Sequence, residues 1–251
     1  MDSPCEFSSS RCRRFSELKR AYDAIVQENG RGYVEALKDF DRLAETRIRK
    51  TLGRGRSADQ AWKSCKGGLY EYAVCRAIEE MLVQIPGLSE RLGLVHGTRL
   101  PDEYRQQIVI ANWTEIMPDT DLAIVDLKTG KVRAILSCKT SLRERLTETA
   151  FWRKELSERG IEYIFVTTDK DGEIRIDTNR YIVMHVIDYT IITDPKQLQN
   201  TVEYWRKRFG DRNDFDALIA KIGGIEKLCE ILCTLAGLRE RTHSCCRGLE
   251  R

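Results

Sequence analysis

The sequence predicts an α/β fold, in which a central mixed β-sheet is flanked by helices and preceded by an N-terminal helical region. Three observations lead to this prediction. Apolar residues recur at helical spacing in most of residues 15–84, short apolar runs bounded by turn residues follow between 107 and 192, and helical spacing returns after residue 200. Helices interspersed with short apolar strands are typical of a sheet covered by helices.

The length and charge allow one large domain. The chain has 251 residues, of which 41% are hydrophobic and 32% charged, and its net charge is only +3. So small a net charge does not by itself indicate a nucleic-acid partner, but basic residues cluster locally at 11–14, 47–56, 143–145 and 206–208. We expect residues 1–60 to form the helical region and 61–251 to form the main domain with C-terminal helices.

The spacing of the cysteines and the first residues of the chain indicate the cellular compartment. The nine cysteines show no spacing typical of a disulfide framework, and the polar N-terminus lacks the apolar segment of a secretory signal. Since no run of about 18 apolar residues exists, no membrane span is expected. We therefore expect a cytoplasmic protein with mostly reduced thiols. A zinc site could be written from Cys229, Cys233, His243, Cys245 and Cys246. We expect no zinc there, because the first two lie four residues apart on a predicted helix and the other three lie in a C-terminal tail.

The N-terminal half is predicted to be helical. In residues 15–28, Leu18, Tyr22, Ile25 and Val26 share one helical face, and Asn29-Gly30 is a common helix stop. Helical spacing continues over 34–53 and, after a loop at 53–58, over 66–84. Residues 85–105 are expected to be mostly loop and 107–113 a strand.

The second half begins with a predicted hairpin, whose strands at 121–126 and 132–139 flank a turn near Lys128-Thr129. Residues 140–159 predict a helix, with Ser141 and Glu144 in the positions of a capping box and Gly160 as its stop. Strands are expected at 161–169 and 181–192, followed by helices from about residue 200.

This hairpin carries the strongest functional signal. Its turn places residue 139 opposite about 119 and residue 137 opposite about 121, so Lys139 lies near Asp119 and Asp121. Two carboxylates beside a lysine suit a Mg²⁺-dependent phosphodiester hydrolase. Pro118-Asp119 alone is usually only a turn, and Lys139 alone only a solvated strand end. The combination favours the functional interpretation.

Two further sets of residues could complete such a site. Glu71 lies at the edge of an apolar helical face, where it is either solvated or held by a partner such as a metal ion. Arg143, Glu144 and Arg145 follow the hairpin; arginine can bind guanine, and a carboxylate can accept from cytosine. Charged triplets are most often solvated, but two arginines at a helix N-terminus oppose its dipole, which favours a functional reason.

The segments PDTDLAIVD (118–126) and SCKTSLRERLTETAFW (137–152) resemble the PD-(D/E)XK nuclease superfamily. More narrowly, they resemble the type II restriction endonucleases that recognise CCGG or CCWGG, the EcoRII, NgoMIV and BsaWI kind. The resemblance implies a restriction-endonuclease-like core, double-stranded DNA as substrate and a homodimer. It also implies Mg²⁺ held by Asp119 or Asp121, Glu71 and the carbonyl of Cys138, with Lys139 acting on the attacking water.

The resemblance leaves some assignments open. Where some members carry a glutamate on the recognition helix, this chain has Trp152, so Glu71, Glu148 or Glu155 completes the site. By the same resemblance, Arg143, Glu144 and Arg145 recognise a site containing CCGG, CC-N-GG or CCWGG. The alternatives are another nuclease of the superfamily, such as a repair or junction-resolving enzyme, and a non-catalytic DNA-binding module.

Overall fold

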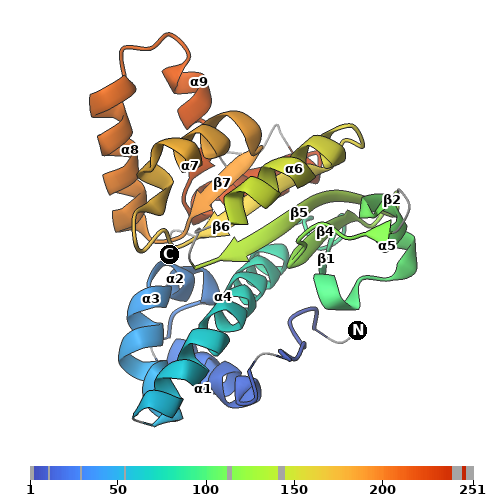
Figure 1. The fold of residues 1–251 in the computed structure, drawn as a ribbon. Helices are drawn as coiled ribbons and strands as arrows, with labels where there is room; N and C mark the ends of the chain where they lie inside the picture. The colour runs from blue at the N-terminus through green and yellow to red at the C-terminus, as the bar shows by residue number, and fades with distance from the viewer. Residues whose placement is uncertain are drawn as a thin grey trace.

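A six-stranded sheet lies at the centre of the fold, with strand order β1-β4-β5-β6-β7-β8 (Figure 1). The computed structural model describes residues 3–10, 12–28, 30–53, 55–111, 115–140, 145–238 and 245–246, and for 145–150 it describes the backbone alone. The pairs β1–β4 and β4–β5 are antiparallel, and the three pairs from β5 to β8 are parallel. The predicted α/β fold with a mixed sheet is thus confirmed.

The strands are short. Those of the main sheet are β1 (Leu92–His96), β4 (Leu122–Asp126), β5 (Lys131–Lys139), β6 (Glu162–Thr167), β7 (Tyr189–Ile192) and β8 (Ile222–Gly223). A separate antiparallel pair is formed by β2 (Ile110–Ala111) and β3 (Glu115–Ile116).

The helices surround this sheet. The α-helices are α1 (Phe15–Glu28), α2 (Tyr33–Lys38), α3 (Phe40–Leu43), α4 (Arg56–Gln84), α5 (Asp102–Ile108), α6 (Arg145–Ser157), α7 (Asp177–Tyr181), α8 (Pro195–Phe209), α9 (Phe215–Ile219) and α10 (Ile225–Leu235). The π-helical turns are η1 (Ala44–Ile48) and η5 (Ile182–Val186), and the 3-10 turns are η2 (Arg49–Leu52), η3 (Gly97–Arg99) and η4 (Glu173–Arg175).

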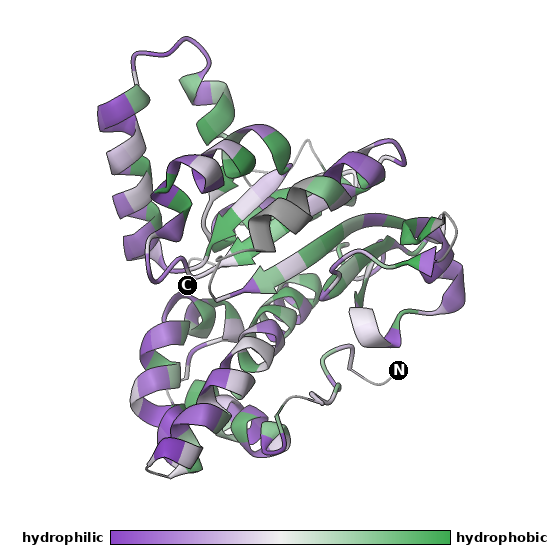
Figure 2. Cartoon of the chain, in the orientation of Figure 1, coloured by the Kyte–Doolittle hydropathy of each residue, from purple (hydrophilic) through white to green (hydrophobic). Residues whose placement is uncertain are grey.

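The core has two parts, one on each face of the sheet. On one face, Leu122, Ile124 and Leu136 pack with α1–α4 and α10; on the other, Ala123 and Ile135 pack with residues of α5, α6, α8, α9 and η5. Figure 1 shows the two helical layers on opposite sides of the strands, and Figure 2 shows apolar strands between helices with hydrophilic outer surfaces. This three-layer arrangement follows from strands that are buried on both faces.

The β4–β5 hairpin has the predicted register at the end that carries the acidic residues. Leu122 pairs with Leu136, as the predicted register requires, and the backbone N–H of Asp121 donates to the carbonyl of Leu136 just before β4 begins. A register shift between Ile124 and Val125 leaves one residue of β5 without a pairing partner on β4, which is a β-bulge. The turn is held by Asp126, whose Oδ1 accepts the backbone N–H groups of Lys128 and Thr129.

The expectation of mostly reduced thiols is wrong. Eight of the nine cysteines form disulfides, and the ninth, Cys138, is free and buried; all nine lie in the described ranges. The pairs are Cys5–Cys75, Cys12–Cys65, Cys229–Cys246 and Cys233–Cys245. The first two have sequence separations of 70 and 53, so the local spacing of cysteines did not indicate the partners.

Three expected elements also differ. Residues 85–105 contain β1, and residues 102–108 form α5. Of the described residues in the strand expected at 107–113, only Ile110–Ala111 are in a strand. Residues 182–186 are helical, and β7 begins at Tyr189. An uninterrupted apolar run such as Ile182–Val186 fits a buried helix as well as a strand, and periodicity alone does not separate them.

The structure contains no described helix that combines the length and apolar character needed to cross a membrane.

Candidate active site

Three side chains converge where the β4–β5 hairpin opens. Nζ of Lys139, the last residue of β5, lies 2.8 Å from Oδ2 of Asp119 and 2.8 Å from Oδ2 of Asp121. Oδ2 of Asp121 also accepts the backbone N–H of Cys138 at 2.6 Å, and the hydroxyl of Ser137 donates to Oδ2 of Asp119 at 3.3 Å. The hairpin register thus brings together the acidic pair and the lysine that the sequence predicted.

Burial makes this cluster electrostatically unusual. The side chain of Asp121 is 15% exposed and that of Lys139 is 10% exposed. Burial, reinforced by repulsion from Glu71 and Asp119, raises the pKa of Asp121 despite the attraction of Lys139. Burial alone would lower the pKa of Lys139, but Asp121 and Asp119 outweigh it and raise that pKa, which keeps the ammonium charged at neutral pH.

Glu71 reaches the same place from α4. Its Oε1 accepts a hydrogen bond from Nε2 of His96, the last residue of β1, and its side chain is 19% exposed. Glu71 is also close enough to Asp121 to raise its pKa. The helix-edge glutamate therefore has a partner, which is a histidine that the sequence analysis did not connect with it. The two residues are 25 positions apart, on a helix and on a strand that was not predicted.

The donor set suits a hard divalent cation. Asp119, Asp121 and Glu71 bring three carboxylates to one place beside a single lysine, and burial with repulsion from Glu71 and Asp119 raises the pKa of Asp121. Carboxylate and backbone carbonyl oxygens are ligands that Mg²⁺ prefers. The thiol of Cys138 is buried, and burial raises its pKa. Only the backbone carbonyl of Cys138 is therefore suited to a hard ion.

These residues line a cleft of about 1710 Å³. Its walls include Ser8–Ser10 of the N-terminal segment, Lys63 and Gly67 of α4, Arg105 of α5 and Trp152 of α6. Small-molecule pockets typically have volumes of roughly 300–1,000 Å³. The cleft is thus large enough for a polymeric substrate.

The remaining predicted residues have different outcomes. Arg143 and Glu144 lie outside the described residues; Arg145 begins α6, but its side chain and that of Glu148 are not described. Glu155 is half-buried on α6 and is not among the residues that line the cleft. Asp102 begins α5, as expected for a Pro-Asp pair with no strand after it.

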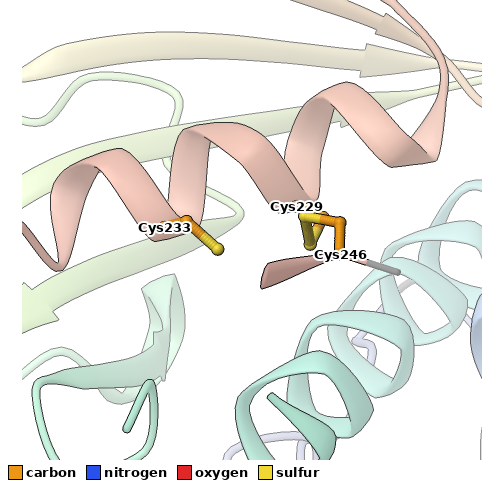
Figure 3. A group of neighbouring side chains, drawn as sticks. All are labelled: Cys229, Cys233 and Cys246. Atoms are coloured by element: carbon orange, nitrogen blue, oxygen red, sulfur yellow. A yellow bond between two sulfur atoms is a disulfide. The ribbon is translucent and has the colours of Figure 1, made fainter. Parts of the chain in front are cut away.

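A second group of metal-ligand side chains lies away from this cleft. Cys229 and Cys233 project from the same side of α10 towards the segment that carries Cys246 (Figure 3), and the sulfur atoms of these three residues lie within 4.8 Å of one another. Cys229 is bonded to Cys246 and Cys233 to Cys245, so these sulfurs are disulfide sulfurs in the structure and not thiolate ligands.

Comparisons with known proteins find similarity to restriction enzymes. Residues 100–217 match the sequence model of the BsaWI type 2 restriction endonuclease family. A protein of Methanocaldococcus jannaschii described as type II restriction enzyme MjaVIP is 26% identical over 155 residues, which cover 55% of this chain and 68% of the relative. Another from Helicobacter pylori, described as type II restriction enzyme HpyAORF263P, is 38% identical over 63 residues, which cover 24% of this chain and 33% of the relative.

A solved structure shares the fold. The restriction endonuclease PspGI, in a complex with substrate DNA, superposes with a TM-score of 0.59 over 89% of this chain and 93% of its own. At 15% sequence identity this similarity concerns the fold alone. The central mixed sheet with flanking helices is therefore a restriction-endonuclease fold.

Proposed function

We propose that this restriction-endonuclease fold works as a type II restriction endonuclease, which hydrolyses a phosphodiester bond of double-stranded DNA with Mg²⁺. The observation that carries the proposal is the meeting of Asp119, Asp121 and Lys139 with Glu71 in one cleft. The similarity to the BsaWI family and the fold shared with PspGI support it.

The roles follow from the contacts. Asp119, Asp121 and Glu71, with the carbonyl of Cys138, would hold the ion, which when bound supplies Lewis-acid polarisation of the phosphate and a more acidic water. Lys139 is held between the two aspartates as a charged ammonium. It would orient the attacking water and offset the negative charge that develops on the phosphate oxygens.

Recognition is assigned to the residues next to this machinery. Arg143, Glu144 and Arg145 stand in sequence just before and at the start of α6, whose Trp152 lines the cleft. Two arginines that bind guanines and a glutamate that accepts from cytosines suit a palindromic site with CCGG, or CC-N-GG or CCWGG, at its core. Such a site is read by two copies related by a two-fold axis, so we propose a homodimer.

A plasmid digest tests the function directly. Purified protein is incubated with plasmid DNA and Mg²⁺, with EDTA as the negative control, and the fragment ends are sequenced. We expect discrete bands, one repeated sequence at the ends, and no cleavage in EDTA. Sedimentation with and without an oligonucleotide that carries this sequence tests the dimer.

The other outcomes identify the alternatives. A smear or structure-dependent nicking would indicate a repair or junction-resolving nuclease of the same superfamily. Binding without cleavage would indicate a DNA-binding module, although the two aspartates around the buried Lys139 give no reason to expect this.

A further inference from the structure

We propose that His96 is a positioning residue, which fixes the carboxylate of Glu71 in the orientation needed to bind the metal ion. The inference rests on the proposed function, because it assigns Glu71 as a ligand. His96 is 3% exposed and lies at the end of β1, and its ring lines the same cleft as Asp119 and Asp121.

The hydrogen bonds of the ring assign its tautomer. The backbone N–H of Thr98 donates to Nδ1 of His96 at 3.2 Å. Because a backbone N–H can only donate, Nδ1 accepts and carries no proton, which leaves the ring proton on Nε2. Nε2–H therefore donates to Oε1 of Glu71. One carboxylate oxygen is thereby occupied, and the direction of the other is set.

The N-terminal segment 5–12 packs against the imidazole ring of His96. Phe7 stacks on His96 with ring centroids 3.7 Å apart and an interplanar angle of 17°. The carbonyl of Phe7 accepts from Nζ of Lys19 at 3.2 Å. The disulfides Cys5–Cys75 and Cys12–Cys65 join this segment to α4 on either side of Glu71 in sequence. The two disulfides therefore hold Phe7, which stacks on His96, to the same helix that carries Glu71.

Gly97, the residue after His96, connects β1 to the segment 119–121, which carries Asp119 and Asp121. The backbone N–H of Gly97 donates to the carbonyl of Asp121 at 2.9 Å. A Cβ at Gly97 would lie 1.8 Å from the carbonyl oxygen of Thr120, so only glycine permits this approach. His96 and Gly97 thus link the end of β1 to α4 and to the segment 119–121, the two parts of the chain that supply the proposed carboxylate ligands.

Residues that hydrogen-bond to metal ligands contribute to metal affinity, and their loss typically costs roughly 10- to 100-fold. His96→Phe keeps a ring that can stack on Phe7 but has no donor. His96→Asn keeps a group that can accept from Thr98 but is too short to reach Glu71. His96→Gln places an amide donor near the position of Nε2. His185, an exposed histidine of η5, provides the control His185→Phe.

The experiment measures Mn²⁺ binding to metal-free protein by electron paramagnetic resonance, and the Mg²⁺ concentration that half-saturates cleavage. We expect His96→Phe and His96→Asn to raise both values by roughly 10- to 100-fold. Cleavage should recover at high Mg²⁺, and His96→Gln and His185→Phe should stay close to wild type. Thermal unfolding identifies the folded variants, and a structural role alone would lower the melting temperature without moving the metal dependence.

The outcomes separate this inference from the function. Asp119→Ala is measured alongside. If it abolishes Mn²⁺ binding while folded His96→Phe or His96→Asn binds Mn²⁺ as tightly as wild type, the positioning role is wrong and the proposed function stands. If wild type needs no divalent ion to cleave DNA, or does not cleave it, the proposed function fails and the inference fails with it.

Discussion

Oδ2 of Asp121 accepts the backbone N–H of Cys138 at 2.6 Å, and the same oxygen lies 2.8 Å from Nζ of Lys139. One oxygen of this carboxylate is therefore committed to the neighbouring strand and its lysine. Asp119 is less restrained, since its side chain is 37% exposed and Ser137 contacts it at 3.3 Å. The two candidate aspartates thus differ in burial and in hydrogen bonding, which makes them separable by experiment.

The first prediction concerns the stability of the metal-free protein. Burial raises the pKa of Asp121, so its ionised form is disfavoured in the folded state relative to the unfolded chain. Stability should fall as the pH rises from about 4 through the raised pKa of Asp121. Asp121→Asn should therefore raise the melting temperature at pH 8 in EDTA. Each kcal/mol added to the free energy of unfolding should raise it by roughly 2–4 °C. The gain should vanish near pH 4.

Asp119→Asn is the matched comparison. Because Asp119 is more exposed, we expect a smaller change in melting temperature, while both variants should lose cleavage. A lower melting temperature for Asp121→Asn at pH 8 would contradict the electrostatic argument. Wild-type cleavage by either variant would remove that aspartate from the set of proposed ligands.

The second prediction concerns Lys139. Lys139→Ala should reduce the cleavage rate by at least about 10²-fold, because it removes a positive charge aimed at the developing charge on the phosphate. Specific DNA binding should remain, since the proposed role of this lysine is at the phosphate and not at a base edge. Lys131→Ala, at the exposed opposite end of β5, is the control and should cleave normally. Rates are measured in single turnover; wild-type cleavage by Lys139→Ala would show that the active site is assigned wrongly.

The sequence was sufficient to predict the hairpin and its acidic cluster because every part of it lies within one continuous segment. The turn near Lys128 determines which residues face each other, and beyond the bulge in β5 Leu122 pairs with Leu136, which leaves Lys139 within reach of Asp119. Glu71 was a candidate because its helix was strongly periodic. Its contact with His96 was not predictable, because β1 alternates apolar residues over only five positions and lies among turn residues.

Long-range packing explains the other differences. The stacking of Phe7 on His96 depends on where the N-terminal segment crosses α4, which no local pattern encodes. The disulfides Cys5–Cys75 and Cys12–Cys65 depend on the same crossing. In the run Ile182–Val186, tertiary context selects a helical turn that an apolar pattern leaves undetermined.

The third prediction concerns the disulfides. Cys5–Cys75 and Cys12–Cys65 close long loops, and each should stabilise the protein by about 4 kcal/mol through the entropy of the unfolded chain. Cys12→Ser combined with Cys65→Ser should therefore lower the melting temperature by roughly 10 °C. Cys138→Ser, which removes the free cysteine, is the comparison and should leave the disulfides intact.

Thiol titration tests the same pairing without mutation. Protein denatured without reductant should expose one reactive thiol, that of Cys138, and reductant should raise the number to nine. Metal analysis after dialysis is done on the same samples. One zinc per chain together with free thiols at Cys229, Cys233, Cys245 and Cys246 would show that this cluster holds a metal ion in place of two disulfides.

The last prediction concerns recognition. If Arg143 and Arg145 bind guanines in the major groove, each contact should contribute roughly 1–3 kcal/mol of discrimination. Arg143→Ala or Arg145→Ala should then weaken binding to the cognate site far more than binding to random DNA, which depends on phosphate contacts. Arg206→Ala, an exposed arginine of α8, should change both equally or not at all. Competition binding in the absence of Mg²⁺ measures both affinities. A cleavage site without adjacent G·C pairs would contradict this assignment while leaving the nuclease activity in place.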